Sequence, residues 1–206
     1  MARQRKDETS YRETTLGIIP RSQLIPLEIE GIKRAWDFVL DQKEKGRSPL
    51  TPTSLQKAHK VGFGWIFPSM SGTYRKIEVQ VSDHTPPKFY YVPQLMADFC
   101  DDLKVRIKHL PKKNNETFLH RLVELLAWAH HRFLWIHPFQ DYNGRIGRLL
   151  INIVLLKLDL PPVELKVETQ MGRKKYITAL QNADGGDYAS LEKLVASAIQ
   201  EAARRW

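Results

Sequence analysis

The chain has 206 residues, of which 42% are hydrophobic and 27% are charged, as is usual for one soluble globular domain. No run approaches the ~20 consecutive apolar residues of a membrane span, the first ten residues are too polar for a secretory signal, and the single Cys100 excludes an internal disulfide. We therefore expect a cytoplasmic protein with no membrane partner. The formal net charge of +9 favours an anionic partner but does not separate nucleotide from nucleic acid.

The N-terminal part divides into an arm and the start of a folded domain. Residues 1–20 show little apolar periodicity, which predicts a flexible N-terminal arm, with the folded domain over 21–206. Apolar residues at helical spacing begin near Ile29, and residues 45–49 end that helix. The pair Thr51–Pro52 is a typical cap and first turn for a second helix.

The apolar period then changes from helical spacing to alternation. Apolar and polar residues alternate over 77–81, residues 83–87 are typical of a turn, and residues 89–91 can supply a return strand. The pattern predicts one small β-hairpin. Since an isolated hairpin is marginally stable, we expect it to lie on a helical body.

The remaining segments are predicted to be helical. Two of them, 118–136 and 149–160, are apolar on nearly every face and are expected to be central and buried. The others are amphipathic and cover 92–107, about 175–181, and 188 to the end. The predicted fold class is mainly α: a helical bundle with one small β-hairpin.

The segment between the two buried helices, His137 to Arg148, breaks local rules in a way that indicates function. A glycine-containing loop that opens a helix presents backbone N–H groups and a positive dipole end to an anion. Arg145 and Arg148 are three residues apart, so both lie on one helix face and can add bidentate phosphate contacts.

Three further side chains of this segment complete a candidate site. Asp141 offers the hard oxygen ligand that Mg²⁺ prefers alongside substrate phosphates, and Asn143 can donate its amide to a phosphate oxygen. His137 has an ordinary pKa suited to a general base near neutral pH. The set predicts phosphoryl or nucleotidyl transfer to a hydroxyl.

The segment resembles the signature of the Fic (filamentation induced by cAMP) family, His-Pro-Phe-x-Asp/Glu-Gly-Asn-Gly/Lys-Arg-x-x-Arg, at every specified position but one. The resemblance extends over most of the chain beyond about residue 25. Residues 72–75 and the predicted hairpin look like the flap of the family, which captures a target segment by strand addition. The resemblance thus implies a Fic-like helical bundle with a β-hairpin flap.

The resemblance also implies an activity, protein adenylyltransfer (AMPylation), which makes the chain a nucleotidyltransferase. His137 would deprotonate a Ser, Thr or Tyr hydroxyl of a target protein, or of the enzyme itself, and that oxygen would attack the α-phosphate of the co-substrate ATP. AMP would be transferred and pyrophosphate released, with Asp141 holding Mg²⁺. The residues implied for nucleotide binding are Asn143, Gly144, Arg145 and Arg148.

The one departure is Tyr142, where the family has glycine. Tyrosine there is either strained at positive φ or sets the loop on another path. Three alternatives therefore stay open: another nucleotide donor such as UTP, GTP or CDP-choline, removal of AMP from modified targets, or an inactive module that binds nucleotide or nucleic acid. Gly144 favours nucleotide transfer over phosphorylation, because the kinases of the family carry Lys at that position.

Many Fic proteins are silenced by a helix with the pattern Ser/Thr-x-x-x-Glu-Gly/Asn, whose Glu pairs with the second signature arginine. Glu30 and Gly31 match its end, although Pro26 stands where Ser or Thr belongs. Ser197 and Glu201 have the right spacing but lack the final residue. Glu30 is the candidate inhibitory residue, with an ordinary surface carboxylate as the alternative.

Overall fold

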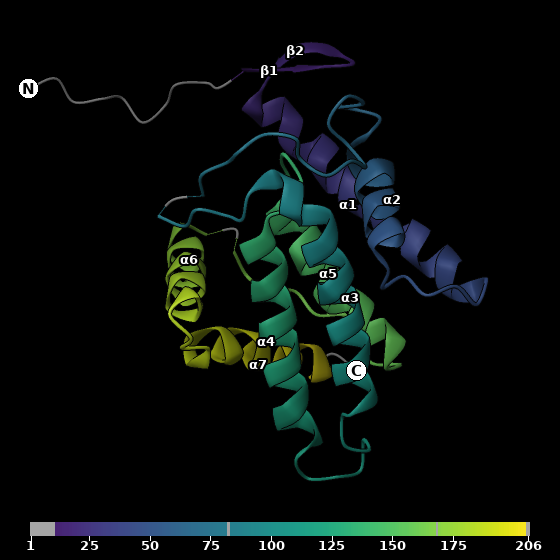
Figure 1. Cartoon of the computed structure of the whole chain (residues 1–206), viewed down its shortest axis with the longest axis vertical. Helices are drawn as coiled ribbons and strands as arrows, with labels where there is room; N and C mark the ends of the chain where they lie inside the picture. The colour runs from purple at the N-terminus through teal and green to yellow at the C-terminus, as the bar shows by residue number, and fades with distance from the viewer. Residues whose placement is uncertain (1–10, 82, 168, 205–206) are drawn as a thin grey trace, which may run out of the picture.

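The structure is a computed structural model that describes residues 11–204 except 82 and 168 (Figure 1). It confirms the mainly α class. The elements are β1 (Tyr11–Thr14), β2 (Gly17–Pro20), α1 (Arg21–Glu44), α2 (Pro52–Phe63), the 3₁₀ helix η1 (Phe89–Tyr91), α3 (Val92–Lys108), α4 (Phe118–Ile136), α5 (Asn143–Lys157), α6 (Gln170–Asp184) and α7 (Ala189–Ala203). Within the described residues, no helix combines the length and apolarity needed to cross a bilayer.

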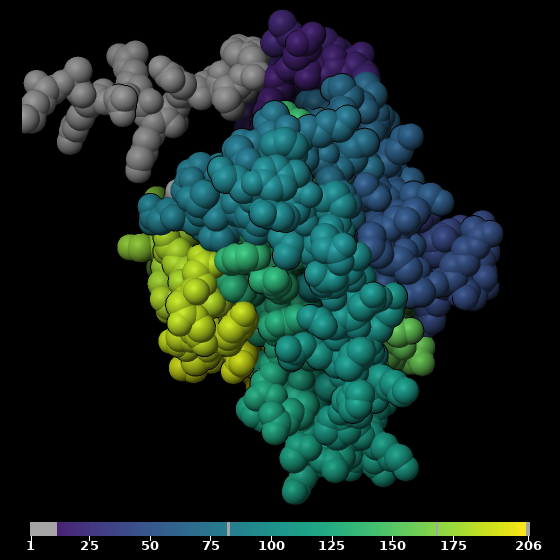
Figure 2. Space-filling model, viewed as in Figure 1, coloured from purple at the N-terminus to yellow at the C-terminus, as the bar shows by residue number. Residues whose placement is uncertain are grey.

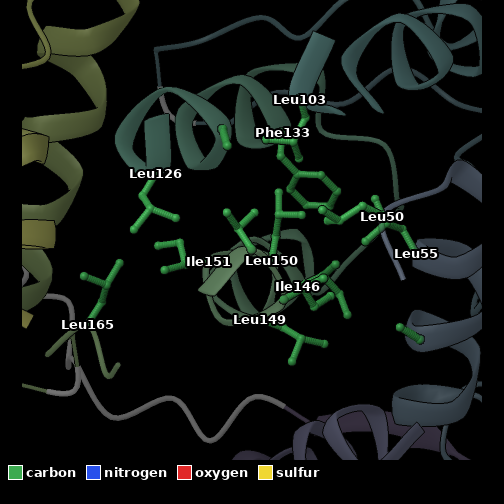
Figure 3. Close-up of a cluster of buried hydrophobic side chains, with 14 of the residues drawn as sticks. Leu50, Leu55, Leu103, Leu126, Phe133, Ile146, Leu149, Leu150, Ile151 and Leu165 are labelled. Atoms are coloured by element: carbon green, nitrogen blue, oxygen red, sulfur yellow. The ribbon is translucent and has the colours of Figure 1, made fainter. Parts of the chain in front are cut away.

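The core is built around α4 and α5, as their apolar sequences predict. Helix α4 packs against α3, α5, α6 and α7, and α5 also contacts α1 and α2. Figure 3 shows Ile146, Leu149 and Leu150 of α5 within a cluster to which α2, α3 and α4 also contribute side chains. Complete burial of each such side chain contributes ~1.5–3 kcal/mol. The loop that joins α4 to α5 is therefore anchored at both ends in the most buried part of the molecule.

Helix α1 begins at Arg21, earlier than the expected start near Ile29, and it contains Pro26. Its buried face already starts at Leu24, and Pro26 removes only one hydrogen bond close to the helix start. Helices α1 and α2 touch through their backbones, because a Cβ atom on Gly31 would lie 2.4 Å from the carbonyl oxygen of Gly62.

The β-hairpin lies at the N-terminal end of the described chain. Strands β1 and β2 pair in antiparallel register, with Tyr11 opposite Pro20. Thr15 fixes the hairpin to the segment after α2, since its N–H donates to the carbonyl of Ile66 (3.1 Å) and its hydroxyl to that of Trp65 (2.6 Å). Residues 11–20 thus form a strand pair within the span 1–20 for which the sequence predicted a flexible arm; residues 1–10 lie outside the described part of the chain.

The hairpin predicted over 77–91 is wrong. Residues 76–88, called the flap segment below, hold one isolated bridge between Val81 and His84, and the expected return strand is η1. The physical reason is that the buried Arg75 binds carbonyl groups of this segment, donating to Ile77 (3.1 Å) and Pro87. Figure 2 shows the flap segment and α3, in teal, as one exposed surface between the purple hairpin and the yellow C-terminal helices.

Candidate active site

The loop between α4 and α5, residues 137–142, is bracketed by two residues in the left-handed conformation. His137 ends α4 at φ 50° and Tyr142 precedes α5 at φ 61°. This conformation costs roughly 1–2 kcal/mol for a residue with a Cβ atom. The surrounding contacts must therefore hold the loop in this path.

His137 is half-buried, and its ring faces the end of its own helix. Its Nδ1 lies 3.3 Å from the carbonyl oxygen of Leu134, which can only accept, so Nδ1 carries the proton and Nε2 keeps a lone pair. Burial lowers the pKa of His137 to about 4, so the ring is neutral at pH 7. His137 is thus in the form that can accept a proton from a hydroxyl.

The N-terminus of α5 is where the sequence predicted an anion-binding site. The N–H groups of Arg145 and Ile146 bond to the carbonyl of Tyr142, while those of Asn143 and Gly144 belong to the unpaired start of the helix. A Cβ atom on Gly144 would meet only Arg148 Nη1, at 3.7 Å, so the space beside this turn is open. The structure therefore brings Gly144, Arg145 and Arg148 together at one helix end.

Asn143 has a different use from the one predicted for its amide. Its buried side chain accepts a hydrogen bond from the N–H of Phe139 (2.9 Å) and donates to the carbonyl of the same residue (2.8 Å). The side chain locks the loop, and its backbone N–H remains part of the helix start. Of the polar groups of Asn143, the backbone N–H is thus the one at the open start of the helix.

Asp141 lies beside the helix start with its side chain 34% exposed. Its Oδ1 accepts from the N–H of Tyr142 at 2.7 Å, and its Oδ2 accepts from Arg12 Nη2 of strand β1 at 2.6 Å. Among the described residues there is no group of three or more His, Cys, Asp or Glu side chains that could hold a metal ion. A single carboxylate beside the start of α5 would fit Mg²⁺, which takes one or two carboxylates together with substrate phosphates.

Tyr142 keeps the left-handed conformation that glycine would have adopted without strain. Its ring is stacked on Phe63 of α2, with centroids 3.9 Å apart and an interplanar angle of 8°, and it also contacts Phe67. Burial, together with the charge of Glu28, raises the pKa of Tyr142 above its ordinary value. Aromatic packing thus offsets the backbone strain.

A buried carboxylate of α1 reaches the site, and it is Glu28. One of its oxygens accepts from Arg145 and the other from Arg21 at 2.6 Å. The candidate inhibitory residue Glu30 points elsewhere: it is exposed and pairs with Arg34 at 3.0 Å. The structure therefore brings Glu28 and not Glu30 to the motif, and to its first arginine rather than the second.

Two buried side chains hold the loop through its backbone. Arg75 donates from Nε to the carbonyl of His137 (2.8 Å), and its own N–H donates to the carbonyl of Pro138 (2.9 Å). His59 of α2 lies with Nε2 3.1 Å from the carbonyl oxygen of Asp141, and its ring stacks on Phe139 at 4.0 Å.

Four residues that contact the site were not predicted as site residues: Arg12, Glu28, His59 and Arg75. The sequence contains an indication of the role of Glu28, because this carboxylate lies at helical spacing from Leu24, Gly31 and Ala35, on the buried face of α1. For His59 the signal was a histidine on the apolar face of α2. Arg12 and Arg75 lie in segments whose path depends on tertiary contacts, so sequence spacing gives no hint of them.

Comparisons with known proteins identify a family and relatives of the chain. Residues 49–155, about half of the chain, match the Fic/DOC family. The chain is 31% identical over 184 residues to a protein adenylyltransferase Fic of Nematostella vectensis, covering 89% of this chain and 40% of that protein. It is 28% identical to the protein of the same name from Aedes aegypti, covering 93% and 36%. The chain thus spans less than half the length of these relatives.

Solved structures share the fold. Fic-1 from C. elegans superposes with a TM-score of 0.68 at 28% identity, covering 86% of this chain and 49% of that chain. A Fic domain protein from Bacteroides thetaiotaomicron superposes with a TM-score of 0.66 at 19% identity, covering 85% and 69%, and supports the fold alone. With its motif loop, its helical architecture and a family match over half of its length, the chain belongs to the Fic/DOC family.

Proposed function

We propose that this chain is the catalytic unit of a protein adenylyltransferase, which transfers AMP from ATP to a Ser, Thr or Tyr hydroxyl of a target protein. One observation carries the proposal: a neutral histidine with a free Nε2 lone pair shares a loop with a helix N-terminus and two arginines. The names of the relatives in Nematostella and Aedes support the choice of an adenylyl group.

In the proposed reaction, the hydroxyl proton of the target moves to Nε2 of His137. The hydroxyl oxygen forms a bond to the α-phosphorus of ATP while the bond from that phosphorus to the bridging oxygen breaks, and pyrophosphate leaves. Asp141 would hold Mg²⁺, which supplies charge neutralisation on the phosphates when it is bound. Its exposed carboxylate next to the open helix end supports this role.

The nucleotide phosphates would lie at the start of α5. The backbone N–H groups of Asn143 and Gly144 would bind phosphate oxygens, and Arg145 and Arg148 would add guanidinium contacts. Within the described residues Arg148 has no carboxylate partner, whereas Arg145 is paired with Glu28. We assign Arg148 to the γ-phosphate, as the signature implies.

The target protein, or a segment of the enzyme itself, would bind along the flap segment. Residues 76–79 belong to no strand and all but Val79 are exposed, and we propose that a target segment pairs with the backbone of this segment by strand addition. We place the reaction in the cytoplasm, because one buried cysteine suits a reducing compartment.

A second candidate keeps the chemistry and changes the donor. Tyr142 fills the position of the signature glycine with a ring packed against α2, so this part of the nucleotide site differs from the family pattern. UTP, GTP or CDP-choline as donors, and removal of AMP from modified targets, remain proposals on this ground.

Intact-protein mass spectrometry tests the function. The chain is incubated with cell lysate proteins and Mg²⁺ plus ATP, UTP, GTP or CDP-choline, beside a His137→Ala control. We expect an adenylyl mass gain on a target or on the enzyme, only with ATP and only with intact His137. A gain from another donor would select the second candidate. Equal labelling by the His137→Ala variant would contradict the proposed mechanism.

A further inference from the structure

His59 is a buried histidine that the reaction scheme does not use, although both of its ring nitrogens have partners at the site. Nδ1 accepts a hydrogen bond from the backbone N–H of Gly72 at 2.9 Å, and Nε2 lies 3.1 Å from the backbone carbonyl oxygen of Asp141. A backbone N–H can only donate and a carbonyl can only accept. The two contacts therefore require a neutral ring with its proton on Nε2.

The Gly72 contact needs a glycine. Gly72 has a φ of 81°, and a Cβ atom there would lie 2.6 Å from Cβ of Lys60. This close approach brings the backbone of the segment after α2 onto the ring of His59. The ring is also fixed from the other side, since it stacks on Phe139 of the motif loop with an interplanar angle of 21°.

We propose that His59 is a positioning residue for the metal-binding carboxylate of Asp141. By donating to the Asp141 carbonyl, the ring fixes the peptide that precedes the left-handed Tyr142. That peptide sets the direction of the Asp141 side chain, whose Oδ1 in turn accepts from the Tyr142 N–H. Groups that orient a metal ligand in this way affect metal affinity without contacting the metal. The inference rests on the proposed role of Asp141.

Two substitutions separate the two nitrogens of the ring. In His59→Gln the terminal amide can retain the donor to Asp141 and loses the acceptor for Gly72, whereas in His59→Asn the carbonyl oxygen retains the acceptor and loses the donor. His131→Gln is the matched control, because His131 is also buried but bonds to Asp184 and Tyr188. Asp141→Asn gives the result expected for complete loss of the carboxylate.

The first measurement is the ratio of ATP dissociation constants without and with Mn²⁺. We expect His59→Asn to reduce this ratio about tenfold, while His59→Gln stays within about threefold of the unmodified chain and His131→Gln matches it. A folded His59→Asn variant with an unchanged ratio would overturn the proposal. An equal loss in both His59 variants would do the same, since it would indicate a general packing role.

The second measurement needs no nucleotide, and its first part uses only the unmodified chain. In a ¹⁵N-histidine NMR spectrum of the unmodified chain, His59 should show an unprotonated Nδ1 and a protonated Nε2; the opposite tautomer would overturn the proposal. In the folded variants, the backbone amide resonances of Asp141 and Tyr142 should shift in His59→Asn and keep their positions in His59→Gln. These readouts hold even where no adenylyl transfer is detected, so a failed activity does not count against His59.

Discussion

Two regions of the chain contact the motif loop, and they do so through different chemistry. The region that runs from α2 to Arg75 binds backbone: His59 and Arg75 reach the carbonyl groups of Asp141 and His137. The N-terminal hairpin and α1 bind charged side chains: Arg12 pairs with Asp141, and Glu28 pairs with Arg145. The first region leaves the functional groups free and sets their geometry, whereas the second occupies groups that metal and nucleotide would need. The region from α2 to Arg75 thus holds the loop in its path, and the hairpin with α1 binds its charged side chains.

The largest effect is expected at Arg75, within the region that binds backbone. Arg75→Ala removes donors to the carbonyl groups of His137, Ile77 and Pro87, and should lower the free energy of unfolding by about 3 kcal/mol. Urea unfolding measures it. Arg106→Ala is the control, since the guanidinium of exposed Arg106 stacks on Trp128 and its loss should cost about 0.5–1 kcal/mol. Full stability in Arg75→Lys would show that charge, and not the guanidinium fork, holds the loop.

The next effect concerns His130, which also holds a backbone carbonyl. Its Nδ1 donates to Gly147 and its Nε2 accepts from Tyr176, and burial lowers the pKa of His130 from 6.5 to about 4. Between these values the unfolded chain binds a proton that the folded chain excludes. The free energy of unfolding should therefore fall with acidification from pH 6.5 to 4, by about 1.4 kcal/mol per pH unit for this group, and stay level above pH 7.

Urea unfolding at a series of pH values checks this dependence. The slope of the free energy of unfolding against pH should be smaller in His130→Gln by the contribution of about one proton. Other buried histidines should supply the remaining slope. A slope of the same size in the variant would assign the effect to other groups.

For the region that binds charged side chains, the sharper test is Glu28→Gln. The neutral amide frees the charge of Arg145, so affinity for ATP should rise on the order of tenfold, which titration calorimetry measures. Glu30→Gln is the matched variant two residues further along α1 and should leave the affinity unchanged, because Glu30 pairs with exposed Arg34. A rise confined to Glu30→Gln would make Glu30 the restraining residue after all.

The smallest effect is expected at Arg12. The pair with Asp141 is exposed, with side chains 46% and 34% accessible, and exposed pairs are worth about 0.2–1 kcal/mol. Arg12→Ala should strengthen Mn²⁺ binding in the presence of ATP by up to about fivefold, with the gain shrinking at high salt. Lys45→Ala removes the same charge from an exposed pair with Asp41 and serves as the control. An equal gain in Mn²⁺ affinity in both variants would show that the effect comes from the change in net charge and not from the pair with Asp141.

The same division explains what could be predicted from the sequence. The motif loop and the two central helices follow from local pattern, since the residues from His137 to Arg148 are contiguous and α4 and α5 are apolar on most faces. The flap segment alternates like a strand, but a strand needs a partner. Its carbonyl groups bind Arg75 instead, and no local pattern reveals that.

The roles of single side chains were harder to predict than the fold. The amide of Asn143 serves the loop because Phe139 lies four residues earlier and offers both an N–H and a carbonyl. Glu28 and Glu30 are two residues apart on one helix and therefore point to different sides. The inhibitory pattern matches Glu30, whereas the carboxylate that contacts the motif lies two positions earlier, at Glu28.

The backbone contact between Gly31 and Gly62 has a mechanical consequence. Because there is no room for a side chain between them, α1 is pinned to α2 three residues beyond Glu28. Release of Arg145 cannot proceed by withdrawal of the whole helix without breaking this contact. The first two turns lie N-terminal to this contact, and there Pro26 lacks a backbone hydrogen bond. The part of α1 that precedes Gly31 thus carries the Glu28 carboxylate and continues directly into the hairpin that bears Arg12.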